Sequence, residues 1–192
     1  MAKSKKSKIY NLIFIIVIAL LIFPQTRQSI QVFVNKGIVS IVKPSIIEDS
    51  ERQSLSNYDW KLRDTLGNNF DFQTAKGKVI VINFWATWCP PCIAEMPSME
   101  LLYKKYEDNN DVVFLFVSNE DVSVIKRFIF KKDYSFKVYQ PLTKYPKKFN
   151  VSSIPRTFII SKKGEIVIDK SGAADWNNER VTKAIDDLIK AF

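Results

Sequence analysis

The sequence contains no histidine among its 192 residues. This absence excludes imidazole general bases, cysteine–histidine nucleophile pairs and histidine metal ligands. Cysteine is almost as scarce, because Cys89 and Cys92 are the only two in the chain. A structural zinc site needs about four ligands, so these two thiolates would require carboxylates or a second chain to complete one. Covalent haem attachment is excluded as well, because Ile93 rather than histidine follows the second cysteine. We therefore expect no metal and no cofactor.

Signals for nucleic-acid binding are also missing. The net charge is +9, but no basic helix or aromatic platform accompanies it. Four of the positive charges lie within the first eight residues, at Lys3, Lys5, Lys6 and Lys8, where no acidic residue occurs. The remaining excess is spread over the chain, which is typical of a solubility feature. The sequence thus predicts no nucleic-acid partner.

An apolar run extends from Ile9 to Phe23 and ends at Pro24. It is either a cleaved secretory signal peptide or an uncleaved signal anchor. Because no small-x-small cleavage site or lipoprotein cysteine follows it, we favour a transmembrane anchor over residues 9–24, although the run is near the lower limit for crossing a bilayer. The positive-inside rule then places residues 1–8 in the cytoplasm as a basic tail. The expected location is a single-pass membrane protein whose globular part lies outside the cytoplasm, in the periplasm or on the outer face.

Residues 25–57 are predicted to form a connector. Apolar residues recur at helical spacing between Ile30 and Val42, and Pro44 ends this stretch. The amphipathic helix would either pack on the globular domain or lie on a membrane surface as a spacer. The polar segment that follows leads into the domain expected over residues 58–192.

Strands and helices alternate from Tyr58 to the C-terminus. Two short alternating segments, 58–62 and 70–72, predict a hairpin. Further elements are expected as strands over 79–84, 112–117, 136–139, 156–160 and 165–169, and as helices over 90–108, 121–132, 144–149 and 175–192. This alternation predicts an α/β domain with a mixed central sheet flanked by helices and the hairpin added at its N-terminal side.

The motif that carries chemistry is Trp-Cys-Pro-Pro-Cys at residues 88–92, directly after an apolar strand. A Cys-x-x-Cys pair between a strand and a helix start is typical of a redox site, because the helix N-terminus stabilises a thiolate on the first sulfur. The competing interpretation is a static structural disulfide, but so short a loop contributes little stability. We interpret Cys89 as the attacking cysteine and Cys92 as the cysteine that resolves the mixed disulfide. Pro90 and Pro91 stiffen the turn between them.

Residues 81–97, with the sequence VINFWATWCPPCIAEMP, resemble the active-site stretch of membrane-anchored thioredoxin-like thiol–disulfide oxidoreductases of the TlpA/ResA type. Residues 154–158 (IPRTF) resemble the cis-proline loop of that family, and residues 161–167 resemble its last hairpin. The resemblance runs from about Tyr58 to the C-terminus and implies a thioredoxin-like fold.

The resemblance also implies roles for single residues. Pro155 would be cis and leave the Ile154 backbone free to pair with an extended substrate segment. Trp88 would flank the attacking cysteine on an exposed rim, and the substrate would contact it together with Pro90, Pro91, Ile154 and Pro155. Trp176 is expected only to pack the last helix.

Asn83 is a departure from thioredoxin itself, which has a buried aspartate for proton transfer at this place on the strand. In the TlpA/ResA type a glutamate three residues after the second cysteine serves instead, and Glu95 matches it. The alternative is that Glu95 is an ordinary acid near the start of a helix, where it favours the helix dipole.

The function implied is a reductant of disulfide-containing protein substrates, with cytochrome c maturation as its setting and a membrane thiol protein as electron donor. Two alternatives stay open at this point. One is an oxidase for oxidative folding, and the other is an interaction module that retains only the thioredoxin fold.

Overall fold

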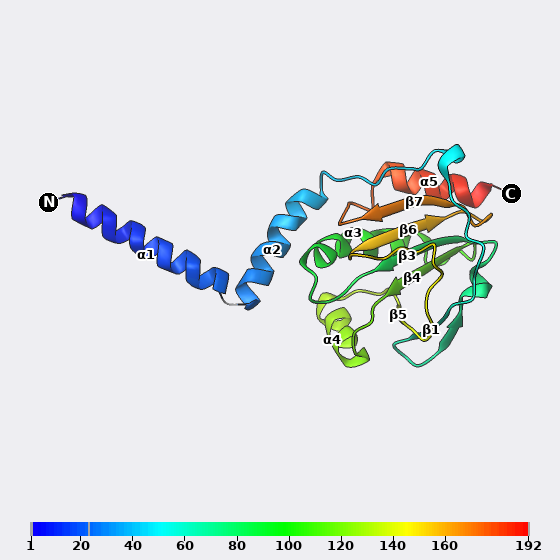
Figure 1. The fold of residues 1–192 in the computed structure, drawn as a ribbon, viewed down its shortest axis with the longest axis horizontal. Coiled ribbons are helices and arrows are strands. Elements are labelled where there is room, and N and C mark those ends of the chain that lie inside the picture. Colours follow the sequence, from blue (N-terminus) through cyan, green and yellow to red (C-terminus); the bar gives the residue numbers. More distant parts are fainter. Residues whose placement is uncertain (1, 23, 192) are drawn as a thin grey trace.

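The computed structural model describes residues 2–22 and 24–191. Its main body is a seven-stranded sheet with the strand order β2-β1-β5-β4-β3-β6-β7 (Figure 1). The strands are β1 (Lys61–Asp64), β2 (Asn69–Asp71), β3 (Val79–Phe84), β4 (Val112–Val117), β5 (Val138–Pro141), β6 (Arg156–Ile160) and β7 (Ile166–Ser171). The helices of this body are α3 (Pro90–Tyr106), α4 (Val122–Lys132) and α5 (Glu179–Lys190), with short 3-10 helices at Asp49–Glu51 and Phe72–Ala75.

The sheet is mixed, as the sequence predicts. Strand β3 runs parallel to β4 and antiparallel to β6, and β4 runs parallel to β5. The predicted hairpin is β1–β2, and its first strand pairs antiparallel with β5 at one side of the sheet. The hairpin therefore extends the sheet, and β3 occupies a central position from which its C-terminal end can present a loop.

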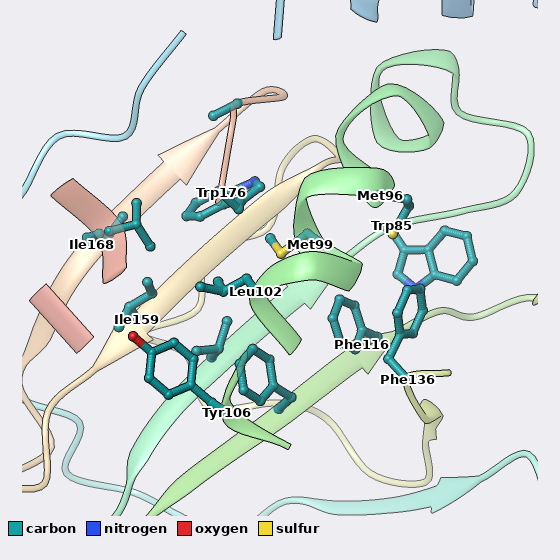
Figure 2. Close-up of a cluster of buried hydrophobic side chains, with 14 of the residues drawn as sticks. Trp85, Met96, Met99, Leu102, Tyr106, Phe116, Phe136, Ile159, Ile168 and Trp176 are labelled. Carbon is teal, nitrogen blue, oxygen red and sulfur yellow. The ribbon is translucent and has the colours of Figure 1, made fainter. Parts of the chain in front are cut away.

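Strand β3 is buried on both faces, which explains its continuous apolar sequence. Because successive side chains point to opposite faces of a sheet, Val79 and Val81 join one apolar cluster while Ile80 and Ile82 join the other. Figure 2 shows the first cluster, in which side chains of α3 such as Met99 lie against the sheet. The second face is covered by the 3-10 helix at Phe72–Ala75 and by loop segments, through the following side chains: Leu55, Trp60, Phe72 and Phe149.

The helix predicted over residues 144–149 is wrong. This segment forms only turns, with one backbone bond from the Phe149 amide to the Pro146 carbonyl at 2.9 Å. Its apolar side chains are fixed by tertiary contacts, because Phe149 is fully buried against Trp60 and Tyr145 packs on Phe84. The last helix also begins later than predicted, since the Asn178 side chain caps it by accepting the Val181 amide.

The predicted membrane anchor and single-pass location are contradicted. Helix α1 (Ala2–Ile22) extends away from the sheet (Figure 1). In residues 2–22 and 24–191, no helix combines the length and the apolar character that crossing a membrane requires. The lysine cluster occupies the first part of α1, and the apolar part after it, residues 9–22, is only about 21 Å long at ~1.5 Å per residue, against a hydrocarbon core of about 30 Å. Phe23 of the predicted span lies outside the described residues.

The connector packs onto the domain. Helix α2 (Pro24–Val39) contacts α3. Beyond it, the Ile47 amide donates to the Val167 carbonyl at 2.8 Å and the Asp175 amide donates to the Val42 carbonyl at 2.9 Å. These bonds attach the connector to the β7 side of the sheet. The Gln28 side chain of α2 donates to the Thr87 carbonyl at 3.2 Å, so α2 lies close to the loop that leads into α3.

Candidate functional site

The two cysteines lie at the junction between the loop that follows β3 and the start of α3. Strand β3 ends at Phe84, the loop that follows carries Trp88, and α3 begins at Pro90. Cys89 and Cys92 form a disulfide with an S–S distance of 2.11 Å and a Cα–Cα distance of 5.2 Å. The site is thus built by a buried strand that fixes the position of the loop and by a helix that begins inside the motif.

Cys89 is the N-cap residue of α3. Its Sγ accepts a hydrogen bond from the Cys92 amide at 3.3 Å. Pro90 and Pro91 have no amide hydrogen, so Cys92 supplies the first amide of the helix that can reach the sulfur. This geometry places Cys89, and not Cys92, at the positive end of the helix dipole, as the sequence predicts. A thiolate at Cys89 would be stabilised there.

A loop before β6 forms the opposite wall of the site. The Ile154–Pro155 peptide bond is cis, as the resemblance implies. The Ile154 carbonyl oxygen lies 3.8 Å from Cys89 Sγ. Both cysteines are buried, with Cys89 3% and Cys92 0% exposed, whereas Trp88 is 65% exposed. The rim of the site is therefore open to a partner, and the sulfur of Cys89 lies just beneath it.

Glu95 lies one turn further along α3 and is fully buried. Its Oε1 accepts from Asn83 Nδ2 at 2.9 Å, and its Oε2 accepts from Trp176 Nε1 at 2.9 Å and from the Ala174 amide at 3.2 Å. Burial raises the pKa of Glu95, and the hydrogen bonds from Trp176, Asn83 and Ala174 lower it by less, so that the resulting pKa is about 7. Since positions i and i+3 of a helix share a face, the carboxyl group lies on the same side of α3 as Cys92.

Two other parts of the chain thus contact Glu95 of α3. Asn83 comes from β3 and also donates to Thr157 Oγ1 on β6 at 2.8 Å. Trp176 comes from the segment between β7 and α5, and Figure 2 shows it among the buried side chains next to Met99. The sequence assigned Trp176 to packing and missed its hydrogen bond. The available signal was that a buried carboxylate needs donors, and an indole N–H is a donor only.

Glu120 is a second contact that the sequence did not reveal. Its carboxylate accepts from the Thr87 amide and from Thr87 Oγ1, both at 2.6 Å, and so holds the loop before Cys89. It also lines a groove of about 650 Å³ beside the redox pair, together with Trp88 and Ile154. The groove thus lies on the Ile154 side of the buried disulfide.

Nothing in the described part of the chain resembles a metal centre. In residues 2–22 and 24–191, no group of three or more His, Cys, Asp or Glu side chains is arranged to hold a metal ion.

The sequence of this chain is similar to proteins of one family. The family model described as Redoxin matches residues 48–187. Thioredoxin-like protein YneN of Bacillus subtilis (strain 168) is 37% identical over 110 residues, covering 56% of this chain and 65% of YneN. The thiol-disulfide oxidoreductase ResA of Halalkalibacterium halodurans is 31% identical over 130 residues, covering 67% of this chain and 72% of ResA. The match to a ResA of Bacillus cereus, 34% identical over 105 residues, covers 61% of that protein. The chain thus spans slightly less than two thirds of YneN and of this second ResA.

Solved structures show the same fold. A crystal structure of a candidate thiol-disulfide oxidoreductase from Bacteroides vulgatus matches with a TM-score of 0.55 and 33% identity, covering 67% of this chain and 90% of that one. A thiol:disulfide interchange protein of the thioredoxin family from Chlorobium tepidum TLS matches with a TM-score of 0.53 at 22% identity, covering 77% and 97%. The predicted thioredoxin-like α/β fold is confirmed.

Proposed function

Since the chain belongs to the Redoxin family, we propose that it is a thiol–disulfide oxidoreductase that reduces disulfides in protein substrates through Cys89 and Cys92. The observation that carries the proposal is the position of Cys89 as N-cap of α3, joined to Cys92 and lying beneath an open rim. The resemblance of the relatives named as thiol-disulfide oxidoreductases supports it. All of these residues fall within the proposed domain, residues 58–192.

The first step is an attack by Cys89. In the reduced protein its thiolate attacks one sulfur of the substrate disulfide, so that a mixed disulfide forms and the other substrate sulfur leaves as a thiolate. The hydrogen bond from the Cys92 amide and the helix dipole both favour the charged nucleophile. Ile154 and Pro155 would hold an extended substrate segment opposite the sulfur, and Trp88, Pro90 and Pro91 would contact it at the rim.

The second step releases the substrate. The Cys92 thiol gives its proton to the Glu95 carboxylate and attacks Cys89 Sγ, and the second substrate sulfur leaves as a thiolate. The substrate gains two electrons and the protein regains its disulfide. A carboxyl group whose pKa is about 7 suits this role, because it can take and return a proton near neutral pH. The Asn83 and Trp176 hydrogen bonds would hold the carboxyl group in place during the transfer.

The reducing direction is supported by the surroundings of the sulfurs. Cys92 is fully buried and lies inside the first turn of α3, away from the helix N-terminus that favours a thiolate at Cys89, so a thiolate on Cys92 is disfavoured; an ionised Glu95 on the same side of α3 disfavours that charge further. Both effects favour the disulfide over the dithiol and make the reduced pair a better electron donor. A second dithiol protein would then reduce Cys89–Cys92 again. We propose as substrates polypeptides with a disulfide between cysteines close in sequence, as in the Cys-x-x-Cys-His haem-attachment segments of cytochrome c.

Single cysteine variants test the proposal. Cys89→Ser should abolish the reduction of insulin disulfides. Cys92→Ser should still attack a disulfide but fail to release it, so mixed disulfides through Cys89 should accumulate and can be identified by mass spectrometry. Alkylation of the reduced wild-type protein at mildly acidic pH should modify Cys89 first.

Two results would contradict the proposal. Equal trapping by both variants, or alkylation that falls first on Cys92, would overturn the assignment of the two roles. A redox equilibrium in which reduced glutathione readily opens the Cys89–Cys92 disulfide would favour an oxidase instead of a reductant. A wild-type protein that leaves insulin disulfides intact would favour an interaction module.

A further inference from the structure

A second groove lies beside the redox pair, between α2, the start of α3 and the end of α4. It has a volume of about 460 Å³. Three lysines line it, Lys36 from α2 and both Lys131 and Lys132 from the last turn of α4. In Figure 1, α2 runs beside the end of the domain that carries the first turn of α3.

This groove adjoins the loop and the helix turn that carry the two cysteines. Thr87, two residues before Cys89, and Ile93, directly after Cys92, both line it. Gln28 Nε2 of α2 donates to the Thr87 carbonyl at 3.2 Å, so α2 is hydrogen-bonded to the loop that carries the attacking cysteine. A polypeptide whose disulfide reaches Cys89 would therefore have part of its chain within reach of the groove.

The charged residues that line the groove are all basic. None of the described residues that line it is acidic. Among the ion pairs of residues 2–22 and 24–191, none involves Lys36, Lys131 or Lys132, whereas Lys104 and Lys105 of α3 each have an acidic partner. Apolar groups lie between the charges, including Phe33, which is 79% exposed. Basic groups around an apolar floor complement a segment that carries both carboxylates and apolar side chains.

We propose that this groove binds an acidic segment of the protein substrate, next to the disulfide that Cys89 attacks. The proposal rests on the proposed function, because it names the substrate class of the same site. Carboxylates of the segment would pair with Lys36, Lys131 and Lys132, and its apolar side chains would cover Phe33. Helix α2 is then part of the substrate-binding surface.

Synthetic peptides with one internal disulfide test this proposal. Two peptides would share the disulfide and differ only in a flank, which is rich in Asp, Glu and Leu in one and in Ser and Leu in the other. Wild-type protein should reduce the acidic peptide with a KM about tenfold lower, since three exposed ion pairs each contribute a modest amount. This advantage should shrink as salt is raised.

Charge-reversal variants locate the effect. Lys36→Glu, Lys131→Glu and Lys132→Glu, singly and together, should raise KM for the acidic peptide and leave kcat nearly unchanged. Reduction of bis(2-hydroxyethyl) disulfide, which is neutral and too small to reach the groove, should stay at the wild-type rate. Lys76→Glu is the matched control, because Lys76 is exposed and lies before β3, at the end of that strand opposite the redox pair.

Lysines in a last helical turn also interact with the helix dipole. If a reversal lowers the thermal stability of the protein, the Lys→Gln variants replace it. A role limited to helix stability would lower the unfolding temperature and leave the ratio of the two peptide KM values unchanged, which would overturn the proposal.

A binding measurement separates this proposal from the proposed function. Peptides with both cysteines replaced by serine can be labelled, and their affinity followed by fluorescence anisotropy. The proposed role of the groove would be overturned if the acidic and neutral peptides bound with equal affinity. It would also be overturned if the lysine reversals left the affinity for the acidic peptide unchanged. Tight, lysine-dependent binding by a protein that reduces neither the peptides nor bis(2-hydroxyethyl) disulfide would support the groove and contradict the proposed function.

Discussion

Replacing Glu95 by glutamine tests whether the buried carboxyl group titrates near neutral pH. The substitution keeps the size of the side chain and its ability to accept from Trp176 Nε1, which lies 2.9 Å from Oε2. It removes the ionisation of this group and, as protonation of the carboxyl group also does, turns one acceptor oxygen into a donor, which Asn83 can meet by turning its amide so that Oδ1 accepts. The comparison with wild type therefore isolates the charge, because every other titrating group is present in both proteins.

The expected magnitude follows from the raised pKa of Glu95. Burial raises this pKa from 4.5 to about 7, so the folded protein holds a proton that the unfolded chain has already lost in this range. The protonated Glu95 therefore contributes its full share to the stability of the folded protein below pH ~4.5. This contribution is lost as the pH rises through ~7, where Glu95 ionises in the folded protein. The loss amounts to about 3 kcal/mol at 1.36 kcal/mol per pKa unit. The variant should not lose it.

Urea unfolding of the oxidised proteins at pH 4 and pH 8.5 measures this difference. Wild type and Glu95→Gln should be of similar stability at pH 4, and the variant should gain about 3 kcal/mol relative to wild type at pH 8.5. The same variant should lose the inflection near pH 7 in the rate of the resolving step. Parallel stability curves for the two proteins across this range would refute the reasoning, and an unchanged pH–rate profile would remove Glu95 from proton transfer.

Two further predictions concern contacts that hold the site and the sheet. Trp176→Phe removes a hydrogen-bond donor from the Glu95 carboxylate, so the pH inflection of exchange should move upward by about one unit; a downward or absent shift in the pH–rate profile would contradict this contact. Gly164→Ala should destabilise the protein in urea unfolding by about 2 kcal/mol, because φ is +83° and the added Cβ would lie 2.7 Å from Tyr58 Oη. Gly67→Ala is its control, since φ is +96° and no atom lies within 4 Å; losses of equal size in the two variants would show that the Tyr58 contact has no effect.

The local parts of this site could be read from the order of the residues alone. The Cys-x-x-Cys spacing makes the disulfide possible, and the prolines that follow Cys89 begin the helix whose N-cap is that cysteine. The apolar run of β3 predicts a strand buried on both faces, and the structure places it at the centre of the sheet. These features depend on neighbours within a few residues, and such patterns are carried by the sequence directly.

The N-terminal region and one loop were predicted less well. The sequence shows an apolar run near the N-terminus. Whether such a run can span a membrane depends on the length of helix that is also apolar, and no helix among the described residues is long and apolar enough. A helix was expected over residues 144–149, whereas Phe149 is held by aromatic rings distant in sequence. A periodic pattern reports which side chains are buried and does not identify the partner that buries them.

The surroundings of the cysteines depend on contacts between distant parts of the chain. Asn83, Glu95 and Trp176 lie far apart along the sequence, and β3, α3 and the segment after β7 bring them into one hydrogen-bonded group. The pKa of Glu95 follows from that burial and could not be read from its position in a helix. Likewise Glu120 meets Thr87 only because β4 pairs with β3. Spacing along the chain sets which groups are available, and packing over long separations sets their distances, their solvation and hence their chemistry.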